Sequence, residues 1–315
     1  MSHLKQNTPS TVLPPSLENL LENYQAHCRR DGLRASSIEL YLKEDRWFLQ
    51  NLSANGCKTA ADISAGHITA ACIALRSKSY LSTVKTFLRF LSENGYTNRD
   101  YSAVVPPYKR PQPLPSIYSE DEIRQFEAAV RANRNRRDYA VVLLATRLGI
   151  RSGDIARLTF DDLDFNNNTI RIVQQKTDTP IELPLLPEIK SAILDYAQNE
   201  RPDVGGENIF LVQSPPHNRL SNILIGKIVQ RGILKAGIVP GSRSRGPHAF
   251  RSSLASSMVN DNVPYEVVRK TLGHADPNAI KSYARLDIEQ LRVYALPVPE
   301  VSGGFLDFLC GRSVL

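Results

Sequence analysis

The chain has 315 residues, with 39 Lys and Arg against 32 Asp and Glu, a formal net charge of +7 and an isoelectric point near 9.2. This length is enough for two domains with hydrophobic cores of their own. The positive charge favours a polyanionic partner, although many proteins without one are mildly basic. No N-terminal apolar segment resembles a signal peptide, and no apolar run approaches the ~18 residues of a membrane span, so we expect a cytoplasmic protein.

The cysteines and histidines are spaced too irregularly for a metal site or a disulfide framework. Four cysteines occur singly along the chain, and the six histidines form no compact set. The phosphate-binding pattern Gly-x-x-x-x-Gly-Lys-Ser/Thr is absent as well. We therefore expect neither a metal ion nor a nucleotide cofactor. The cysteines are Cys28, Cys57, Cys72 and Cys310.

The first part of the chain has the pattern of a small helical bundle. Residues 1–15 are rich in Pro, Ser and Thr with little apolar periodicity, which predicts a mobile tail. Four segments then carry apolar residues at spacings of three and four, as on one face of a helix. These segments are 17–30, 36–54, 64–76 and 80–94. Together they predict a compact helical domain over residues 16–105.

A proline-rich stretch over residues 106–116 divides the chain. Prolines at this density prevent a helix and favour an extended, semi-rigid connection. Behind it, Ser119 and Glu122 form a capping-box pattern, which marks the start of a helix. A second domain is therefore predicted to begin at residue 117.

The second domain, predicted over residues 117–296, has mostly helical patterns. One small sheet is expected over residues 163–185, with a turn at Asn166-Asn167-Asn168. The predicted fold is therefore mainly α, with an α+β second domain that combines many helices with a small antiparallel sheet.

Arg151 lies at a corner between two helical patterns. It follows an apolar run with a glycine and precedes Ser152-Gly153-Asp154-Ile155-Ala156-Arg157-Leu158, which predicts a short helix. Taken alone, such an arginine would be expected only to neutralise Asp154 or to cap a carbonyl.

The segment Pro247-His248-Ala249-Phe250-Arg251 begins another helical pattern. Proline favours the first helical position, and residues three apart share a helix face, so His248 and Arg251 should project side by side. A guanidinium matches two phosphate oxygens at once, and an imidazole can exchange a proton near neutral pH. This spacing alone is weak evidence, because most His-x-x-Arg pairs are incidental surface residues.

Two further motifs follow, and the set as a whole is specific. In their order and at about their separations, these motifs resemble those of the tyrosine recombinases, the phage-type integrase family. The resemblance covers about residues 15–295, and five elements must coincide for it. They are Arg151, His248, Arg251, Leu272-Gly273-His274 and Tyr283.

The resemblance implies a role for each of these residues. It makes Tyr283 the nucleophile. It makes Arg151 and Arg251 a clamp on the phosphate, and it places His248 and His274 in the same catalytic pocket.

Lys176 completes the implied set. It lies at a Thr-Asp-Thr turn between two alternating segments, where the family carries a catalytic lysine on a β-hairpin; without the resemblance it would be an ordinary solvated lysine. The chain departs from the common family pattern twice. Phe250 replaces a usual leucine and is expected to pack inward, while Asp154 replaces a usual glutamate and is expected to orient Arg151.

The chemistry that the resemblance implies is the attack of a tyrosine hydroxyl on a DNA phosphodiester. Such a hydroxyl has a pKa near 10, so it must lose its proton or have its charge stabilised nearby. Two arginines can stabilise the developing charge, each worth roughly 3–4 kcal/mol by analogy with oxyanion-hole donors. The lysine would protonate the leaving 5′-oxygen. The product is a 3′-phosphotyrosyl link that keeps the bond energy, so no nucleotide hydrolysis is required.

The family's helical domain grips DNA from the face opposite the catalytic domain, which makes basic residues of this chain candidates for contacts with double-stranded DNA. The basic loop over residues 241–246, just before the His-x-x-Arg pair, is a further candidate. For each residue the alternative is an ordinary solvated side chain. The candidates are Lys43, Arg46, Lys78, Lys85 and Arg89 in the helical domain, Lys109 and Arg110 in the linker, and Arg243 and Arg245 in the loop.

The last segment, residues 297–315, ends in Phe305-Leu306-Asp307-Phe308-Leu309-Cys310. An apolar cluster of this kind is unfavourable in an exposed tail and should dock on protein. Following the family's habit, we expect it to dock on a neighbouring subunit in a cyclic, tetrameric synapse on two duplexes. The alternative is packing on its own domain.

The function predicted from these observations is site-specific DNA recombination, by an integrase of a mobile element. Two alternatives stay open. A type IB topoisomerase would use related chemistry to relax supercoils, and a catalytically silent relative would only occupy DNA sites. The sequence identifies neither the target bases nor the direction of the reaction, because base readout depends on a few side chains in the grooves.

Overall fold

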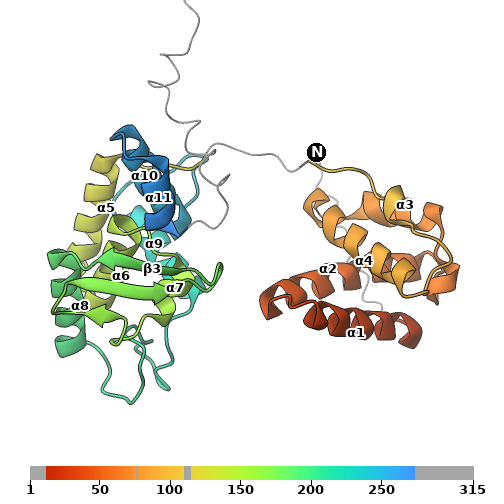
Figure 1. The fold of residues 1–315 in the computed structure, drawn as a ribbon, viewed down its shortest axis with the longest axis horizontal. Coiled ribbons are helices and arrows are strands. Elements are labelled where there is room, and N and C mark those ends of the chain that lie inside the picture. The colour runs from red at the N-terminus through yellow and green to blue at the C-terminus, as the bar shows by residue number, and fades with distance from the viewer. Residues whose placement is uncertain (1–11, 76, 110–114, 274–315) are drawn as a thin grey trace, which may run out of the picture. The chain divides into compact units, whose positions relative to one another are not determined.

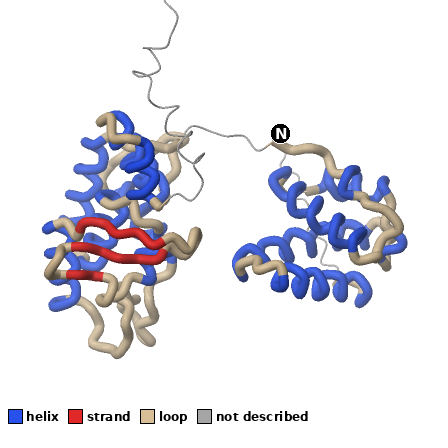
Figure 2. The backbone as a smooth tube through the Cα atoms, in the orientation of Figure 1, coloured by secondary structure: helices blue, strands red, loops and turns tan. Residues whose placement is uncertain are grey.

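The computed structural model describes residues 12–75, 77–109 and 115–273, which fall into two compact units, Met1–Gln112 and Pro113–Leu315 (Figure 1). Helices dominate both units, and the strands form one small sheet in the second (Figure 2). This confirms the predicted fold class. Within the described ranges, no helix is both long and apolar enough to cross a membrane.

Unit 1 is a bundle of four helices, as the apolar spacing predicts. In α1 the buried residues Leu17, Leu20, Leu21 and Tyr24 recur at intervals of three and four, and Pro15 stands at the first helical position. Helix α2 packs against the other three helices and so lies at the centre of the bundle. The four helices are α1 (Pro15–Arg30), α2 (Ala35–Ala54), α3 (Ala65–Ala74) and α4 (Leu81–Glu93).

One carboxylate lies inside this bundle. Asp45 of α2 is 0% exposed, and no described residue donates a hydrogen bond to either of its carboxylate oxygens. Burial raises the pKa of Asp45 well above its usual range, and the negative charge of the neighbouring Glu44 raises it further. Asp45 is therefore a source of pH-dependent stability in unit 1.

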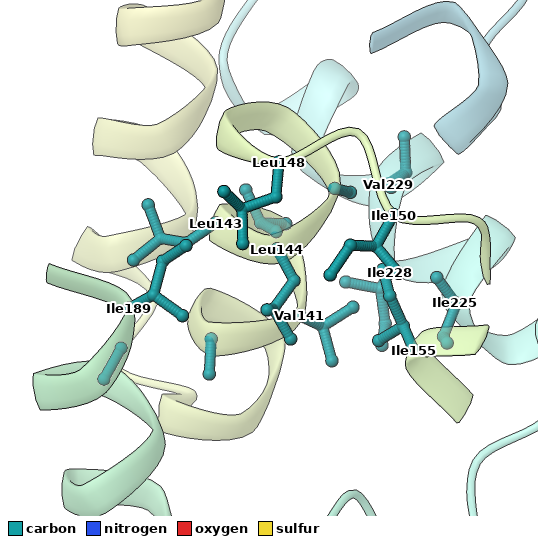
Figure 3. Packing of buried hydrophobic residues seen from close by; sticks show 14 of the residues in the cluster. Val141, Leu143, Leu144, Leu148, Ile150, Ile155, Ile189, Ile225, Ile228 and Val229 are labelled. Atoms are coloured by element: carbon teal, nitrogen blue, oxygen red, sulfur yellow. The ribbon is translucent and has the colours of Figure 1, made fainter. Parts of the chain in front are cut away.

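Unit 2 is built around helix α6. Its residues Val141, Leu143 and Leu144 are buried on different sides of the helix, because α5, α8, α9 and α10 all pack against it (Figure 3). A helix that is apolar nearly all round belongs in the interior of a domain. The helices of unit 2 are α5 (Glu120–Ala132), α6 (Arg136–Arg147), α7 (Ser152–Arg157), α8 (Pro187–Asn199), α9 (Asn222–Lys235), α10 (Pro247–Asn260) and α11 (Tyr265–Leu272).

The sheet of unit 2 is antiparallel, in the order β1-β2-β3. In β2, Ile170 and Ile172 are buried while Arg171 and Val173 are exposed, which is the period of two expected of a half-buried strand. Ile170 faces Leu183 across the hairpin of β2 and β3. The strands are β1 (Leu163–Asp164), β2 (Thr169–Val173) and β3 (Pro180–Pro184). They lie inside the range predicted for the sheet.

Candidate active site

Arg151 lies at the corner between α6 and α7, where it is the residue that precedes the first turn of α7. The chain turns sharply here because Gly149 adopts a φ of 61°, which favours glycine. A Cβ atom on Gly149 would lie 3.1 Å from side-chain carbons of both Leu254 and Leu272, so α10 and α11 pack closely against this corner. The predicted corner and the short helix after it are both confirmed.

Arg251 projects from the first turns of α10, which begins at Pro247 as predicted. The side chain is buried, with 2% of the residue exposed. Its Nη1 donates a hydrogen bond to the carbonyl oxygen of Gly149 at 2.7 Å, and its Nη2 donates to the carbonyl oxygen of Leu272. The guanidinium therefore joins the corner that carries Arg151 to the end of α11.

Gly273 ends α11 in the left-handed conformation, with φ 59° and ψ 50°. A Cβ atom here would lie only 2.5 Å from Cδ of Gln174. Both the backbone conformation and this close approach require glycine. The structure thus explains why the central residue of the Leu272-Gly273-His274 motif is a glycine.

Gln174 is a residue of this site that the sequence did not single out. It follows β2, is 0% exposed, and its Nε2 donates to the carbonyl oxygen of Leu272 at 3.1 Å. Its Oε1 accepts a hydrogen bond from Nη1 of Arg151 and one from the hydroxyl of Thr177 at 3.1 Å. The sequence did contain a signal for Gln174. Side chains two residues apart lie on the same face of a strand, so Gln174 continues the inward face of Ile170 and Ile172. A polar side chain on a buried face must find hydrogen-bond partners.

Lys176 lies at the turn between β2 and β3, as predicted, and is exposed. The turn closes through the carbonyl oxygen of Gln174, which accepts hydrogen bonds from the backbone N–H groups of Thr177 and Asp178 at 3.3 and 2.8 Å. Asp178 adopts a φ of 50°, which aspartate tolerates better than most residues. The hairpin thus presents Lys176 from a hydrogen-bonded turn.

His248 lies near enough to Arg251, Lys176 and Arg151 for their charges to act on its ring. Its pKa lies below the usual range, mainly because the surrounding protein desolvates its ring, although the residue as a whole is exposed. The positive charges of Arg251, Lys176 and Arg151 lower it further, in that order. These three cations, drawn from α10, the hairpin and the α6–α7 corner, therefore lie near a single imidazole. That imidazole is largely neutral at neutral pH.

His274, Tyr283 and the segment 297–315 lie outside the described residues, as does Arg110. The description of the chain stops at Gly273, one residue before His274. The last described carbonyl groups, of Leu272 and Gly273, accept hydrogen bonds from Arg251 and Arg151 respectively, the latter at 3.4 Å.

The two departures from the family pattern have different outcomes. Phe250 packs inward as predicted, stacked on the ring of Phe126 at 4.6 Å between centroids. The expectation that Asp154 orients Arg151 stays a prediction, because the hydrogen bonds described for Asp154 go to other groups. Oδ1 of Asp154 accepts instead from Arg157 at 2.8 Å and from the backbone N–H of Gln175 at 3.0 Å. Asp154 lies in the first turn of α7 and so faces the residue three positions further along that helix.

Arg243 is engaged in a structural contact rather than displayed on a flexible loop. Its guanidinium donates to both carboxylate oxygens of Glu122 at 2.7 Å and lies 4.3 Å from the centre of the Tyr118 ring. Glu122 also closes the predicted capping box with Ser119 at the start of α5. The expectation of a flexible basic loop is corrected accordingly, because Arg243 ties the loop to α5. Arg245 is exposed.

The basic candidates of unit 1 that the structure describes are exposed, but one of them, Arg46, is already paired. Arg46 donates to Glu18 with both terminal nitrogens, so its guanidinium is held against α1. Lys85 and Arg89 lie one turn apart on α4, and Asp100 is close enough to feel both charges. Hydrogen bonds from Ser102 are the main reason that the pKa of Asp100 is lowered, and Arg89 and Lys85 lower it further. The exposed candidates in this unit are Lys43, Lys78, Lys85, Arg89 and Lys109.

Comparisons with known proteins identify the family of this chain. The model of the phage integrase family matches residues 117–290. A protein of Sinorhizobium fredii described as an integrase/recombinase, y4gC, is 32% identical over 191 residues, which is 59% of this chain and 97% of the relative. A second, y4rF, is 32% identical over 223 residues, 69% of this chain. That alignment spans only about half, 52%, of the relative's own length.

Solved structures share the fold. A lambda integrase fragment, residues 75–356, bound as a dimer to a core site, matches with a TM-score of 0.65 and 17% identity over 90% of this chain and 99% of that chain. The XerH recombinase bound to its palindromic difH substrate matches with a TM-score of 0.65 and 19% identity over 87% and 82% of the two chains. The chain belongs to the phage integrase family, as the sequence motifs predicted.

Proposed function

We propose that this protein is a site-specific DNA recombinase that cuts and rejoins DNA through a 3′-phosphotyrosyl intermediate. The observation that carries the proposal is the position of Arg151 and Arg251, which are joined through Gln174 and Leu272, beside the turn that carries Lys176. All three charges act on His248. Three cations around one neutral imidazole suit a phosphodiester, whose transition state gathers negative charge on its non-bridging oxygens.

In the reaction we propose, the hydroxyl oxygen of Tyr283 attacks the phosphorus atom and the bond from phosphorus to the 5′-oxygen breaks. Arg151 and Arg251 hold the non-bridging oxygens. Lys176 donates a proton to the departing 5′-oxygen. His248, kept neutral by its surroundings, can accept the proton of the attacking hydroxyl.

Rejoining is the reverse of this step. A 5′-hydroxyl from another strand attacks the phosphotyrosine, and the tyrosine leaves with its proton restored. Because the phosphodiester energy is conserved in the protein–DNA link, the cycle needs no nucleotide hydrolysis. His274 is proposed as a further member of the same pocket.

We propose double-stranded DNA with specific recombination sites as the substrate and a tetramer on two duplexes as the active assembly. The support is analogy, because the structural relatives include a lambda integrase tetramer bound to a Holliday junction and a Tn1549 transposon integrase bound to a circular-intermediate DNA. The latter supports a role in a mobile element. We propose that the protein acts in the cytoplasm.

The proposed division of labour follows the chain. Residues 16–105 would bind DNA, and residues 106–116 would link this domain to the next. Residues 117–296 would carry out the cleavage and rejoining, and residues 297–315 would bind a neighbouring subunit. The exposed basic residues of unit 1, with Arg110 and Arg245, are the proposed backbone contacts. Arg46 and Arg243 could contribute only by giving up their ion pairs with Glu18 and Glu122.

The test is covalent capture on DNA. Sites selected by the protein from a random duplex library would be nicked close to the cleavage point, so that the short leaving strand diffuses away. We expect a covalent complex with the parent protein and none with Tyr283→Phe, which removes only one hydroxyl. Tyr265→Phe is the matched control, because Tyr265 is an exposed tyrosine at the start of α11.

Three outcomes would contradict the proposal. A covalent complex retained by Tyr283→Phe would reassign the nucleophile. Specific DNA binding by the parent without any covalent product would make the protein a silent DNA-binding relative. Capture on every duplex regardless of sequence, with relaxation of supercoils, would favour a topoisomerase instead.

A further inference from the structure

We propose that Gln174 is a positioning residue for Arg151, holding its guanidinium where the scissile phosphate binds. This inference rests on the proposed function, since it assumes that Arg151 acts on the phosphate. Gln174 itself has 0% exposure and so would not touch the DNA.

The side-chain amide of Gln174 joins three separate segments. Its Oε1 accepts from Nη1 of Arg151 at the α6–α7 corner and from the hydroxyl of Thr177 in the β2–β3 turn. Its Nε2 donates to the carbonyl oxygen of Leu272, the last residue of α11. The turn and the helix end therefore fix the amide, and the amide fixes the arginine.

Hydrogen bonds and a short piece of backbone close these contacts into a ring. The carbonyl oxygen of Leu272 also accepts from Nη2 of Arg251, and Nη1 of Arg251 donates to the carbonyl oxygen of Gly149. Gly149 is joined through the backbone to Arg151, two residues further on. Gln174 and Leu272 thus connect the two arginines on one side, and Gly149 connects them on the other. The spacing between the two halves of the phosphate clamp is set by this ring.

The hydrogen bonds made at position 174 favour an amide side chain. The position needs an acceptor for a cation and a donor for a carbonyl in one short planar group, which glutamine provides. Glutamate would accept from Arg151 but would place a carboxylate oxygen against the Leu272 carbonyl and cancel part of the charge on Arg151. Methionine has a similar length and would make none of the hydrogen bonds.

The close fit of Gly273 supports the same assignment. A Cβ atom on Gly273 would overlap the Gln174 amide, with Cδ only 2.5 Å away. The glycine before His274 therefore leaves room for the amide of Gln174, and Gly273 in turn accepts a hydrogen bond from Nη2 of Arg151 through its carbonyl oxygen.

The experiment measures single-turnover cleavage of the nicked DNA by the full chain. Gln174→Met should slow cleavage by about 10- to 100-fold, the size of effect expected when a catalytic group is displaced by roughly 1 Å. Gln175→Met is the matched control, because Gln175 is the adjacent residue, is exposed, and accepts from Arg157 instead. We expect the control to cleave within about threefold of the parent.

A double-mutant cycle separates positioning from general stability. In an Arg151→Ala background, Gln174→Met should change the cleavage rate by less than about threefold, because the group through which it acts is gone. A substrate with sulfur in the bridging 5′ position should not rescue Gln174→Met, since the defect lies in the arginine clamp and not in proton donation by Lys176. Equal loss in both backgrounds would overturn the proposal.

Gln174→Glu gives a second measurement that does not depend on the methionine variant being well folded. A protonated carboxyl group has the donor and acceptor pattern of the amide, whereas a carboxylate lacks the donor for the Leu272 carbonyl oxygen. Burial favours the protonated form, while the positive charges of Arg151 and Arg251 favour the carboxylate. The rate of Gln174→Glu should therefore be below that of the parent at pH 8 and should rise toward it as the pH falls to 5. Cleavage by Gln174→Glu at the rate of the parent at pH 8 would also overturn the proposal.

The two proposals fail in distinguishable ways. If the parent protein gives no covalent product, the proposed function fails. If the parent and Gln175→Met cleave normally and Gln174→Met does so as well, only the role of Gln174 fails.

Discussion

Arg251 is a charged side chain with only 2% of its surface exposed, and a buried charge is costly unless its hydrogen bonds are satisfied. Its partners are the carbonyl oxygens of Gly149 and Leu272. Leu272 is the last residue of α11, where carbonyl groups lack partners within the helix and the helix dipole is negative. The end of α11 therefore holds the arginine in place, which is the preorganisation that the proposed catalysis needs.

Asp45 supplies a prediction about stability. Its folded-state pKa is raised by burial, so its contribution to stability is fully present below the pKa of the unfolded chain, near 3.9, and is lost as the pH rises toward the folded pKa. Each pH unit in this window costs about 1.4 kcal/mol. Unit 1 should therefore lose stability as the pH rises above about 4, and Asp45→Asn should remove most of this slope.

Urea unfolding at several pH values measures this slope. The single tryptophan, Trp47, lies in α2, so its fluorescence reports on unit 1. Glu39→Gln, on an exposed position of the same helix, is the control that should keep the slope of the parent. Equal slopes in the parent and in Asp45→Asn would show that the carboxyl is not the source.

At the scale of elements, the β2–β3 hairpin does more than carry Lys176. Its inward face adds Ile170 and Ile172 to the core of unit 2, and the next inward residue, Gln174, reaches the end of α11. The β3 strand also packs against α11. The hairpin is therefore braced on both of its sides, which holds the exposed lysine at a defined place beside His248.

The position of Lys176 on this hairpin leads to a prediction about proton transfer. If Lys176 protonates the leaving 5′-oxygen, Lys176→Ala should cleave ordinary DNA at least about 100-fold more slowly than the parent, within the range of general acid catalysis. A substrate with a bridging 5′-sulfur should restore cleavage, because a thiolate leaves without a proton. Arg251→Ala should show no such rescue.

Single-turnover rates on the two substrates decide between the roles of Lys176. Equal defects on both would mean that the lysine contacts the phosphate or is merely solvated. Lys190→Ala, which changes a lysine bound to Phe165 and Asn168 away from the hairpin tip, serves as the control for loss of one positive charge.

At the scale of the whole molecule, each unit has a hydrophobic core of its own. Separate cores let each unit keep its fold independently of the other. The last segment, residues 297–315, lies outside the described residues, and its role in joining subunits stays a prediction.

Truncation after Val301 tests that prediction. We expect single-site DNA binding to stay near that of the parent while complexes that join two duplexes, and strand exchange, are lost. The reason is that the apolar residues Phe305 and Phe308 would no longer be available to a neighbouring subunit. Gel-shift assays and sedimentation measure both properties.

A full-length variant with Phe305→Ser and Phe308→Ser separates chain length from apolar contact. It should behave like the truncation. Unchanged synapsis in either variant would mean that the tail packs on its own domain or has no part in assembly.

Much of the fold could be predicted from the sequence, because helices and strands are encoded locally. The intervals of three and four in α1, the capping box of Ser119 and Glu122, and the alternation of β2 each depend on residues close together in the chain. The candidate site could be predicted in part, since an arginine, a His-x-x-Arg pair, a Leu-Gly-His motif and a tyrosine at these separations indicate the family without coordinates.

Only the tertiary structure decided which of these side chains are partners. Gln174 and Leu272 are 98 residues apart and meet because the β2–β3 hairpin packs against α11. In the same way, Arg243 pairs with Glu122 across 121 residues, and Asp45 is enclosed by the helices around it. Periodicity determines which face of an element is buried, but the partner on that face depends on how the elements pack, and no local pattern contains that information.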